Sequence, residues 1–395
     1  MNIEIAKWKN NAQSPVVFMI DDLANVLMKK NTSSDLAIGE DWGYACRDKN
    51  SMWHFLTKNL LNKFPEIKTT FFLVTDIRAA MRLGEKYTYT QAIDRDENFM
   101  EFLKYLDANP KVELSYHGTT HGKAAVDYDD FLQEWETFSS LEDAVSQTNR
   151  GKELFKKVLG YYPSGGKYCG YMSGDFGDES IAKSGFKWWS YNYDYLKWDK
   201  NDTNPSYTFD LEFNRGVVNI PTTVDASTLS LKIVNKWFKR KYLKSLYLYF
   251  VKDKSIENHL ASLYNNQEVI SIYEHSSPYR TDEVIQYPNI VSDMDNLIYL
   301  FSYLSNKDVW YATCDELADY FIDREKVQLE VEDNRFELKS NEALNSTLTL
   351  VLSNLKEAYS LYDMENNLLV KSVKKNETYI LSHAFKVNQT YQLLV

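Results

Sequence analysis

The sequence is short of cysteine, glycine and proline, and each shortage excludes a class of protein. Its three cysteines, Cys46, Cys169 and Cys314, are odd in number and widely spaced, so neither a disulfide framework nor a zinc ribbon is expected. With 14 glycines and 8 prolines in 395 residues, long linkers and low-complexity tracts are not expected either. The cysteine usage favours a reduced, cytoplasmic setting.

Long apolar runs are missing as well. No run approaches the roughly 18 residues that a membrane span needs, and the segment Met1–Lys9 lacks the apolar core of a secretion signal. No glycine-rich phosphate loop opens an expected helix, so nucleotide binding has no support. The net charge of −11 argues against general binding to nucleic acids.

What the chain does contain is a large supply of apolar residues, arranged in two patterns. Hydrophobic residues make up 44% of the sequence, enough for a large core and two domains. Residues 15–320 alternate between strand and helix patterns, which predicts an irregular (β/α) barrel of seven or eight units. The expected strands are 15–21, 68–74, 111–117, 165–169, 186–192, 217–223, 268–274 and 308–312, and the expected helices are 52–63, 97–107, 150–158, 177–184 and 292–304.

From about residue 326 the pattern changes to short alternating strands. Val327, Leu329 and Val331 alternate with polar residues, and turn-like polar stretches separate the segments that follow. This alternation is typical of antiparallel strands with one buried face. We therefore expect an α/β barrel domain over residues 1–325 and a small, sandwich-like antiparallel β-domain over residues 326–395.

Three of the expected strands end in residues that bind metals or move protons. The strand 15–21 ends in Asp21-Asp22, the strand 111–117 runs into His117-Gly118-Thr119-Thr120-His121, and the strand 268–274 leads to His275. Two histidines four residues apart suit a borderline-soft divalent metal, and adjacent carboxylates tolerate each other beside a cation. Because parallel strands gather their carboxyl ends at one edge, we expect these residues in one site.

These motifs, in this order, resemble the polysaccharide deacetylase family (NodB-homology, carbohydrate esterase family 4) over residues 14–322. The resemblance implies that Asp22, His117 and His121 hold a divalent metal, Zn2+ first, with Co2+, Ni2+ or Mn2+ as alternatives. It also implies that Asp21 is the catalytic base and His275 the general acid. The implied reaction is the hydrolytic removal of an acyl group, most often N-acetyl, from a carbohydrate.

The chain departs from the family pattern in its third and fourth motifs. Lys167, in Gly166-Lys167-Tyr168-Cys169-Gly170, stands where the family has an Arg that positions the catalytic Asp, and lysine lacks the planar pair of donors. Asp194 loosely echoes the Asp that orients that Arg. We therefore expect Lys167, Tyr168 and Asp194 to orient or bind the substrate in a divergent member. The alternatives are a catalytically degenerate carbohydrate-binding protein, or a metal hydrolase for an O-acyl ester, a cyclic amide or a lipid-linked sugar.

Two further segments have no place in the barrel pattern. Residues 25–50 follow the Asp pair and show no regular pattern. A long irregular loop beside an expected site often forms a rim that shapes the substrate site. Residues 231–254 carry eight Lys or Arg interleaved with apolar residues at helical spacing. This basic stretch suits peripheral contact with an anionic membrane or a lipid-linked substrate. A helix packed on the barrel, with its lysines in water, is the alternative.

Overall fold

The computed structural model describes residues 1–27, 51–191, 209–226 and 257–395. The chain divides into two compact units. The larger unit comprises Val16–Lys307 and Tyr311–Asp315, and the smaller unit comprises Met1–Pro15, Asp308–Trp310 and Glu316–Val395. Over the described ranges, no helix combines the length and apolar character needed to cross a membrane. The division at residues 325 and 326 stays a prediction.

The larger unit is built on a mostly parallel sheet whose order is β11-β12-β10-β9-β6-β4-β2-β14-β13. The pair β11–β12 is antiparallel and the other pairs along this order are parallel. The strand bounds are β2 Ser14–Leu23, β4 Thr69–Leu73, β6 Val112–Tyr116, β9 Gly165–Lys167, β10 Trp188–Ser190, β11 Glu212–Asn214, β12 Val217–Asn219, β13 Val224–Asp225, β14 Ile270–His275 and β15 Val309–Tyr311. All eight strands expected from the sequence are therefore present.

The sheet is curled, because one short segment joins its two ends. Strand β12 pairs with β10 near one edge, and β13 pairs with β14 at the other. Only residues 220–223 separate β12 from β13, and five peptide units span at most about 18 Å. Within this link the Thr222 and Ser190 hydroxyls lie 3.3 Å apart, and the Thr223 N–H donates to the Ser271 carbonyl at 3.2 Å. This curl is consistent with the expected barrel.

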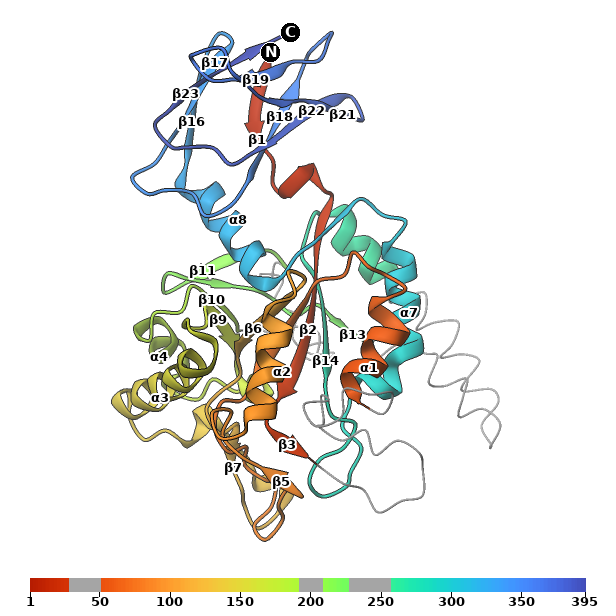
Figure 1. Cartoon of the computed structure of the whole chain (residues 1–395), viewed down its shortest axis with the longest axis vertical. Coiled ribbons are helices and arrows are strands. Elements are labelled where there is room, and N and C mark those ends of the chain that lie inside the picture. The colour runs from red at the N-terminus through yellow and green to blue at the C-terminus, as the bar shows by residue number, and fades with distance from the viewer. Residues whose placement is uncertain (28–50, 192–208, 227–256) are drawn as a thin grey trace. The chain divides into compact units, whose positions relative to one another are not determined.

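Helices flank the sheet of the larger unit, with α3 and α4 on one side and α1 and α7 on the other (Figure 1). Most begin at a polar side chain that accepts hydrogen bonds from the first turn, as Ser51, Asp96, Ser140 and Asn289 do. The cap at Ser140 makes α3 begin nine residues before the expected start at residue 150. The helix bounds are α1 Met52–Leu56 (continued by a π-turn, Thr57–Leu61), α2 Glu97–Asp107, α3 Leu141–Leu159, α4 Gly177–Lys183, α7 Ile290–Leu304 and α8 Cys314–Lys326.

Two short antiparallel strand pairs complete the larger unit. Strand β3 (Val26–Leu27) pairs with β5 (Tyr89–Thr90), and β7 (Gly122–Lys123) pairs with β8 (Leu132–Gln133). The β7–β8 pair follows His121 directly, so the histidine motif is anchored on both sides by strand pairing.

The smaller unit contains two antiparallel sheets, ordered β1-β18-β22-β21 and β16-β17-β23-β19-β20. Alternate residues are buried in β17, where Phe336 and Leu338 face inward, as the pattern from residue 326 predicts. The first strand was not expected: β1 pairs with β18 across some 350 residues. The bounds are β1 Asn2–Ile5, β16 Gln328–Glu332, β17 Arg335–Lys339, β18 Leu348–Ser353, β19 Ser360–Tyr362, β20 Leu368–Lys371, β21 Val373–Lys375, β22 Thr378–His383 and β23 Thr390–Leu394.

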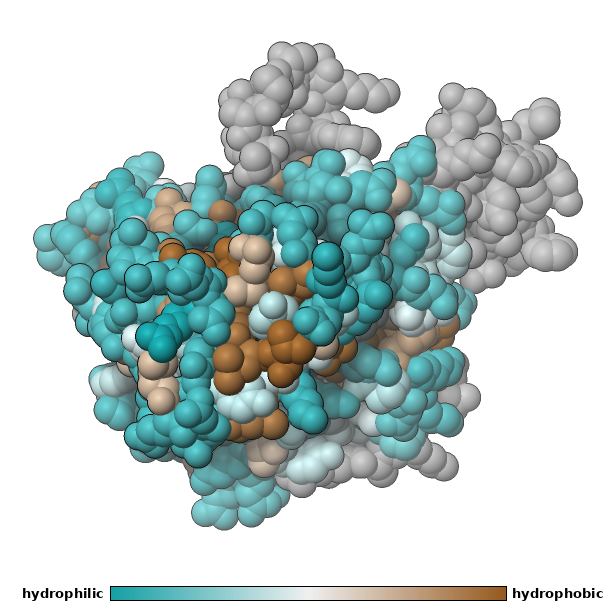
Figure 2. Space-filling model, turned by 90° about the horizontal axis from the view of Figure 1, so that it is seen from above, coloured by the Kyte–Doolittle hydropathy of each residue, from teal (hydrophilic) through white to brown (hydrophobic). Residues whose placement is uncertain are grey.

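The surface is mostly hydrophilic, with apolar side chains gathered in places. In the smaller unit Leu368, Val373 and Val395 are exposed. Figure 2 shows a face on which apolar residues form a central patch surrounded by hydrophilic ones. Exposed apolar side chains are common on soluble domains, so this patch alone points to no function.

Candidate metal and catalytic site

The residues singled out by the sequence lie at the carboxyl ends of four parallel strands. Asp21 and Asp22 are near the end of β2, His275 ends β14, Lys167 ends β9, and His117 directly follows β6. Asp21 and His275 are paired in register between β2 and β14. The parallel arrangement of these strands therefore brings residues from four distant parts of the sequence to one edge of the sheet.

The two oxygens of Asp22 face different partners. Oδ1 lies 2.9 Å from His121 Nε2 and 3.4 Å from His117 Nε2, and all three side chains are buried. Oδ2 accepts hydrogen bonds from Arg78 Nη2 at 3.0 Å and from Gln286 Nε2 at 3.1 Å. One oxygen is thus turned toward the histidine pair while the other is held by two donors.

Two of these residues have a strained backbone. Asp22 has a φ of +69° and His121 has a φ of +71°, values that residues with a Cβ rarely adopt. Such conformations cost on the order of 1–3 kcal/mol each and persist only where the surroundings enforce them. Gly118 has a φ of +83°, and a Cβ there would lie 2.6 Å from Glu134 Oε2, so only glycine fits.

Glu134 provides the surroundings that hold the histidine loop. Its buried carboxylate accepts hydrogen bonds from the backbone N–H groups of Thr119 at 2.8 Å, Thr120 at 2.7 Å and His121 at 2.8 Å. Burial raises the pKa of Glu134, and these three donors oppose that shift. The loop is therefore shaped by one carboxylate that lies 13 residues beyond His121.

The protonation of His117 supports a cation between the side chains. His117 Nδ1 lies 3.1 Å from the Lys167 carbonyl oxygen, which can only accept, so Nδ1 carries the proton. His117 Nε2 then faces the Asp22 carboxylate at 3.4 Å. Asp22 Oδ1 is buried and has no hydrogen-bond donor among the described residues, and a cation between this oxygen and the imidazole nitrogens would satisfy it.

The pKa shifts and spacing of these groups also fit a metal site. Burial acts to raise the pKa of Asp22, but the charge of Arg78 beside it holds that pKa well below its usual value, so the carboxylate is ionised. Burial lowers the pKa of His121 to about 4, so its ring is neutral near pH 7. Ligands about 2.0–2.1 Å from a tetrahedral zinc lie about 3.3 Å from one another, close to the 2.9 and 3.4 Å found here.

Cys169 lies close to the same two histidines. One nitrogen from each histidine and the Cys169 sulfur lie within 4.8 Å of one another, an arrangement that could hold a metal. The thiol donates to the His117 carbonyl at 3.2 Å, and burial raises its pKa well above the usual value. Because the thiolate is the ligating form of cysteine, the ionised Asp22 is the better third ligand.

Lys167 takes the position expected of it beside Asp21. Its Nζ lies 2.7 Å from Oδ2 and 3.0 Å from Oδ1 of Asp21, and both side chains are buried. Burial lowers the pKa of Lys167, whereas the Asp21 carboxylate acts to raise it. A single ammonium thus contacts both oxygens of the Asp21 carboxylate.

The ring of His275 is oriented by a hydrogen bond to a backbone carbonyl and not by the candidate metal ligands. Its Nδ1 donates to the Pro288 carbonyl at 2.8 Å, which leaves Nε2 as the other ring nitrogen for substrate. His275 lines a cavity of about 270 Å³ together with the three candidate metal ligands, Asp22, His117 and His121. The other side chains around this cavity are Arg78, Met81, Tyr87, Tyr128, Gln133, Arg280, Ile285, Gln286 and Tyr287, with Gly170.

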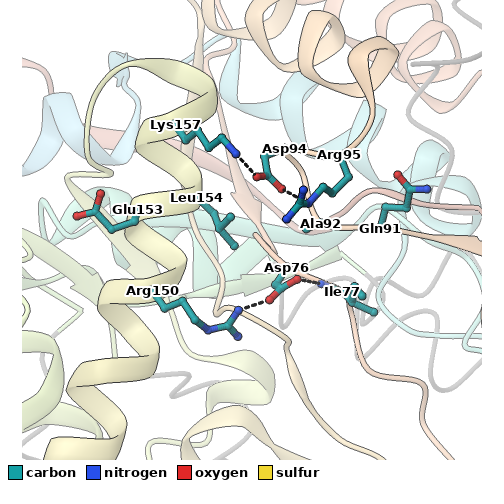
Figure 3. Close-up of a pocket in the computed structure, with 10 residues that line it drawn as sticks. All are labelled: Asp76, Ile77, Gln91, Ala92, Asp94, Arg95, Arg150, Glu153, Leu154 and Lys157. Atoms are coloured by element: carbon teal, nitrogen blue, oxygen red, sulfur yellow. Dashed lines mark hydrogen bonds and ion pairs between the residues drawn. The ribbon is translucent and has the colours of Figure 1, made fainter.

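A larger cavity of about 550 Å³ lies between α3 and the segment before α2, and it differs in chemistry (Figure 3). Its acidic and basic side chains pair with one another: Arg150 with Asp76, and Lys157 with Asp94. It has no histidine or cysteine, and the three acids balance the three bases among its lining residues. We therefore take the smaller cavity, which contains the histidines, as the candidate site.

One expected substrate contact, Tyr168, does not line this cavity. Tyr168 is buried in an aromatic core with Trp135 and Trp189, and its hydroxyl donates to Asp178 at 2.9 Å, so its side chain is a core residue instead. Asp194 lies outside the described residues, as do 231–254 and most of 25–50. Asp21 is buried beneath Lys167 and does not line the cavity either.

Sequence reasoning missed four residues of the site: Arg78, Glu134, Gln286 and Arg280. Each lies on a loop or a short 3-10 turn (Glu134–Thr137 in one case), where no periodic pattern marks a side chain as inward-facing. Only the positive charge of Arg78, five residues after the end of strand β4, hinted at a partner for the Asp pair. Loop contacts of this kind depend on the fold rather than on local sequence.

No known family profile and no curated protein matches the chain. Among solved structures the chain is similar to a Mycobacterium smegmatis protein assigned as a polysaccharide deacetylase, with a TM-score of 0.43, 15% identity, and coverage of 81% of this chain and 94% of that one. It is similar to PuuE allantoinase, with a TM-score of 0.43, 15% identity and coverage of 80% and 93%. It is also similar to a family 4 acetyl xylan esterase of Clostridium thermocellum in complex with cobalt, with a TM-score of 0.34, 11% identity and coverage of 77% and 90%. The function therefore rests on the site's residues rather than on these similarities.

Proposed function

We propose that this protein is a metal-dependent hydrolase that removes an acyl group, most often N-acetyl, from a carbohydrate or glycan precursor. One observation carries the proposal: the ionised Asp22 Oδ1 lies 2.9 and 3.4 Å from two imidazole nitrogens in a buried, strained site. Asp22, His117 and His121 would hold the metal, with Zn2+ favoured by two imidazoles and one carboxylate, and Co2+, Ni2+ or Mn2+ as alternatives.

A divalent cation held there would polarise the acyl carbonyl and make water a better nucleophile. Asp21 would take the proton of the attacking water, with its carboxylate oriented by Lys167 from 2.7 Å. His275 would give a proton from Nε2 to the departing amine or alcohol, since its Nδ1 is already engaged with Pro288. Arg78 and Gln286 would keep Asp22 turned so that only Oδ1 faces the metal position.

The contact between Lys167 and both oxygens of Asp21 supports an active enzyme over a degenerate carbohydrate-binding protein. The charge that orients the base is retained although the residue type has changed. The same ligand set would also serve an O-acyl ester, a cyclic amide or a lipid-linked sugar. A role for residues 231–254 in membrane or lipid contact stays a prediction.

The decisive experiment measures metal content and acetate release together. The purified chain is stripped with a chelator, reloaded with Zn2+, Co2+, Ni2+ or Mn2+, and assayed on N-acetylated and O-acetylated sugars and on a cyclic amide. We expect about one metal per chain and hydrolysis that depends on it. Stoichiometric metal without hydrolysis of any of these compounds would leave the carbohydrate-binding alternative, and absence of metal binding would overturn the metal site itself.

A further inference from the structure

The charges that line the candidate cavity do not balance, although the protein as a whole is acidic. Arg78 and Arg280 line the cavity, and Asp22 is the only carboxylate among its lining residues. These lining side chains alone carry a formal charge of +1 when the histidines are neutral, and Asp282, which pairs with Arg280 from outside the lining, offsets that charge. In the larger cavity of Figure 3, by contrast, three acids balance three bases.

Arg280 is held rigidly at this cavity. Its Nε donates to Asp282 Oδ1 at 3.1 Å, and its Nη2 donates to Asp282 Oδ2. The guanidinium lies 3.3 Å from the ring centroid of Tyr128, which also lines the cavity. Burial acts to raise the pKa of Asp282, but the ion pair with Arg280 lowers it. A planar guanidinium fixed by a carboxylate on one edge and a ring on one face is preorganised.

One edge of Arg280 remains available for a ligand. Within the described part of the chain, Nη1 has no hydrogen-bond partner. Arg280 offers planar, charge-assisted hydrogen bonding of the kind that carboxylates and phosphates accept. The Gln133 side chain lines the same cavity, and its Oε1 can accept a hydrogen bond from a hydroxyl or an amide N–H.

We infer that the substrate carries an anionic group, a carboxylate or a phosphate, which binds Arg280 while the acyl group lies at the metal position. This inference rests on the proposed function and names its substrate class. A hydroxyl or the amide N–H of the same substrate binds Gln133 Oε1. Neutral acetylated sugars then bind more weakly, because they leave the Arg280 edge without a partner in a partly dehydrated cavity.

The test compares substrates that differ by one charge. N-acetylglucosamine, its C6-carboxylate analogue and its 6-phosphate are given to the metal-loaded protein, and kcat and KM are measured by acetate release. We expect kcat/KM to be about 10- to 100-fold higher for at least one anion, the range for one charge-assisted hydrogen bond. The two anions distinguish a carboxylate site from a phosphate site.

Variants of Arg280 test whether this side chain causes the preference for anionic sugars. Arg280→Gln is expected to remove the anion preference through KM, whereas Arg280→Lys retains part of the preference. Arg95→Gln is the matched control, because Arg95 lines the larger, charge-balanced cavity. Equal kcat/KM for neutral and anionic sugars, or a preference that survives Arg280→Gln, overturns the inference.

Calorimetric titration with the same three sugars separates this inference from the proposed function. If no sugar is hydrolysed but an anion binds more tightly than the neutral sugar, and Arg280→Gln abolishes the difference, the hydrolase proposal fails and the anion site stands. If acetate is released and no anion preference appears in binding or turnover, the hydrolase proposal stands and the anion site is wrong.

Discussion

The two ends of the parallel strands each contain a carboxyl group removed from water, and the two groups are stabilised in opposite ways. At the carboxyl end, Asp22 is ionised because Arg78 and the histidines offset its burial. At the amino end, Glu113 of β6 accepts hydrogen bonds from Thr70 at 2.8 Å, Ser115 at 2.9 Å and the Asp315 N–H at 3.1 Å. Burial and the Asp315 carboxylate raise the pKa of Glu113 to about 8.

The difference shows what each end of the sheet is built to do. At the amino end, the Glu113 carboxyl group accepts hydrogen bonds from neutral donors. This group is protonated near pH 7. At the other end Asp22 is a charged carboxylate whose Oδ1 lies 2.9 and 3.4 Å from two imidazole nitrogens, and the backbone is strained at Asp22 and His121. Strain and unbalanced charge are costly for stability, so they mark the end of the sheet that serves function.

The sharpest way to break this comparison is to remove the charged carboxylate. Asp22→Ala should abolish both stoichiometric metal and acetate release, because two imidazoles alone leave the site without its anionic ligand. Metal content by elemental analysis and an acetate assay check this outcome. A variant that still binds one tight metal per chain would show that other residues, such as Cys169, complete the site.

Asp21→Asn separates chemistry from metal binding at the same end of the sheet. The amide keeps the shape of the side chain and cannot take a proton, so metal should remain while kcat falls by about 10²- to 10⁴-fold. Turnover and metal content are measured on the same preparation. Hydrolysis at the wild-type rate would rule out Asp21 as the base.

Glu134→Gln tests whether the histidine loop is shaped by its carboxylate. The amide can accept only on one side, so backbone N–H groups of the loop lose an acceptor. Metal affinity should fall by about 10- to 100-fold, as is typical when a partner of a ligand is lost. Competition with a chelator measures the affinity, with Glu153→Gln in the larger cavity as the control. Unchanged affinity would mean that the loop holds its conformation without this clamp.

Glu113→Gln changes the opposite end of the sheet, so it should have the smallest effect on metal binding and turnover. The pKa of Glu113 is about 8 in the folded chain against 4.5 for an ordinary glutamate, so the folded state binds the proton more tightly. Its contribution to stability is therefore complete below about pH 4.5 and is lost as the pH rises through about 8. From pH 5 to pH 9 the wild type should lose on the order of 4 kcal/mol relative to Glu113→Gln in urea unfolding, because each pKa unit corresponds to about 1.4 kcal/mol. Parallel pH profiles for the two proteins would contradict this.

The order of strands and the histidine motif were readable from the sequence because they are local signals. Apolar runs of strand length and helical spacing are set by neighbours a few residues apart, and these predicted the strands of the larger unit's parallel core except β13, which lies just beyond the expected strand 217–223. The same signals located Asp21, Asp22, His117 and His275 at strand ends, and the topology of parallel strands brought them together.

Only the tertiary structure decided which side chains surround these residues. Arg78, Gln286 and Glu134 reach the site from loops without periodic pattern, and Tyr168 lies in the core although its neighbour Lys167 contacts Asp21. Likewise β1 found its partner some 350 residues away. Local sequence determines the conformation of a segment, whereas burial, charge pairing and contact between distant segments depend on how the whole chain packs.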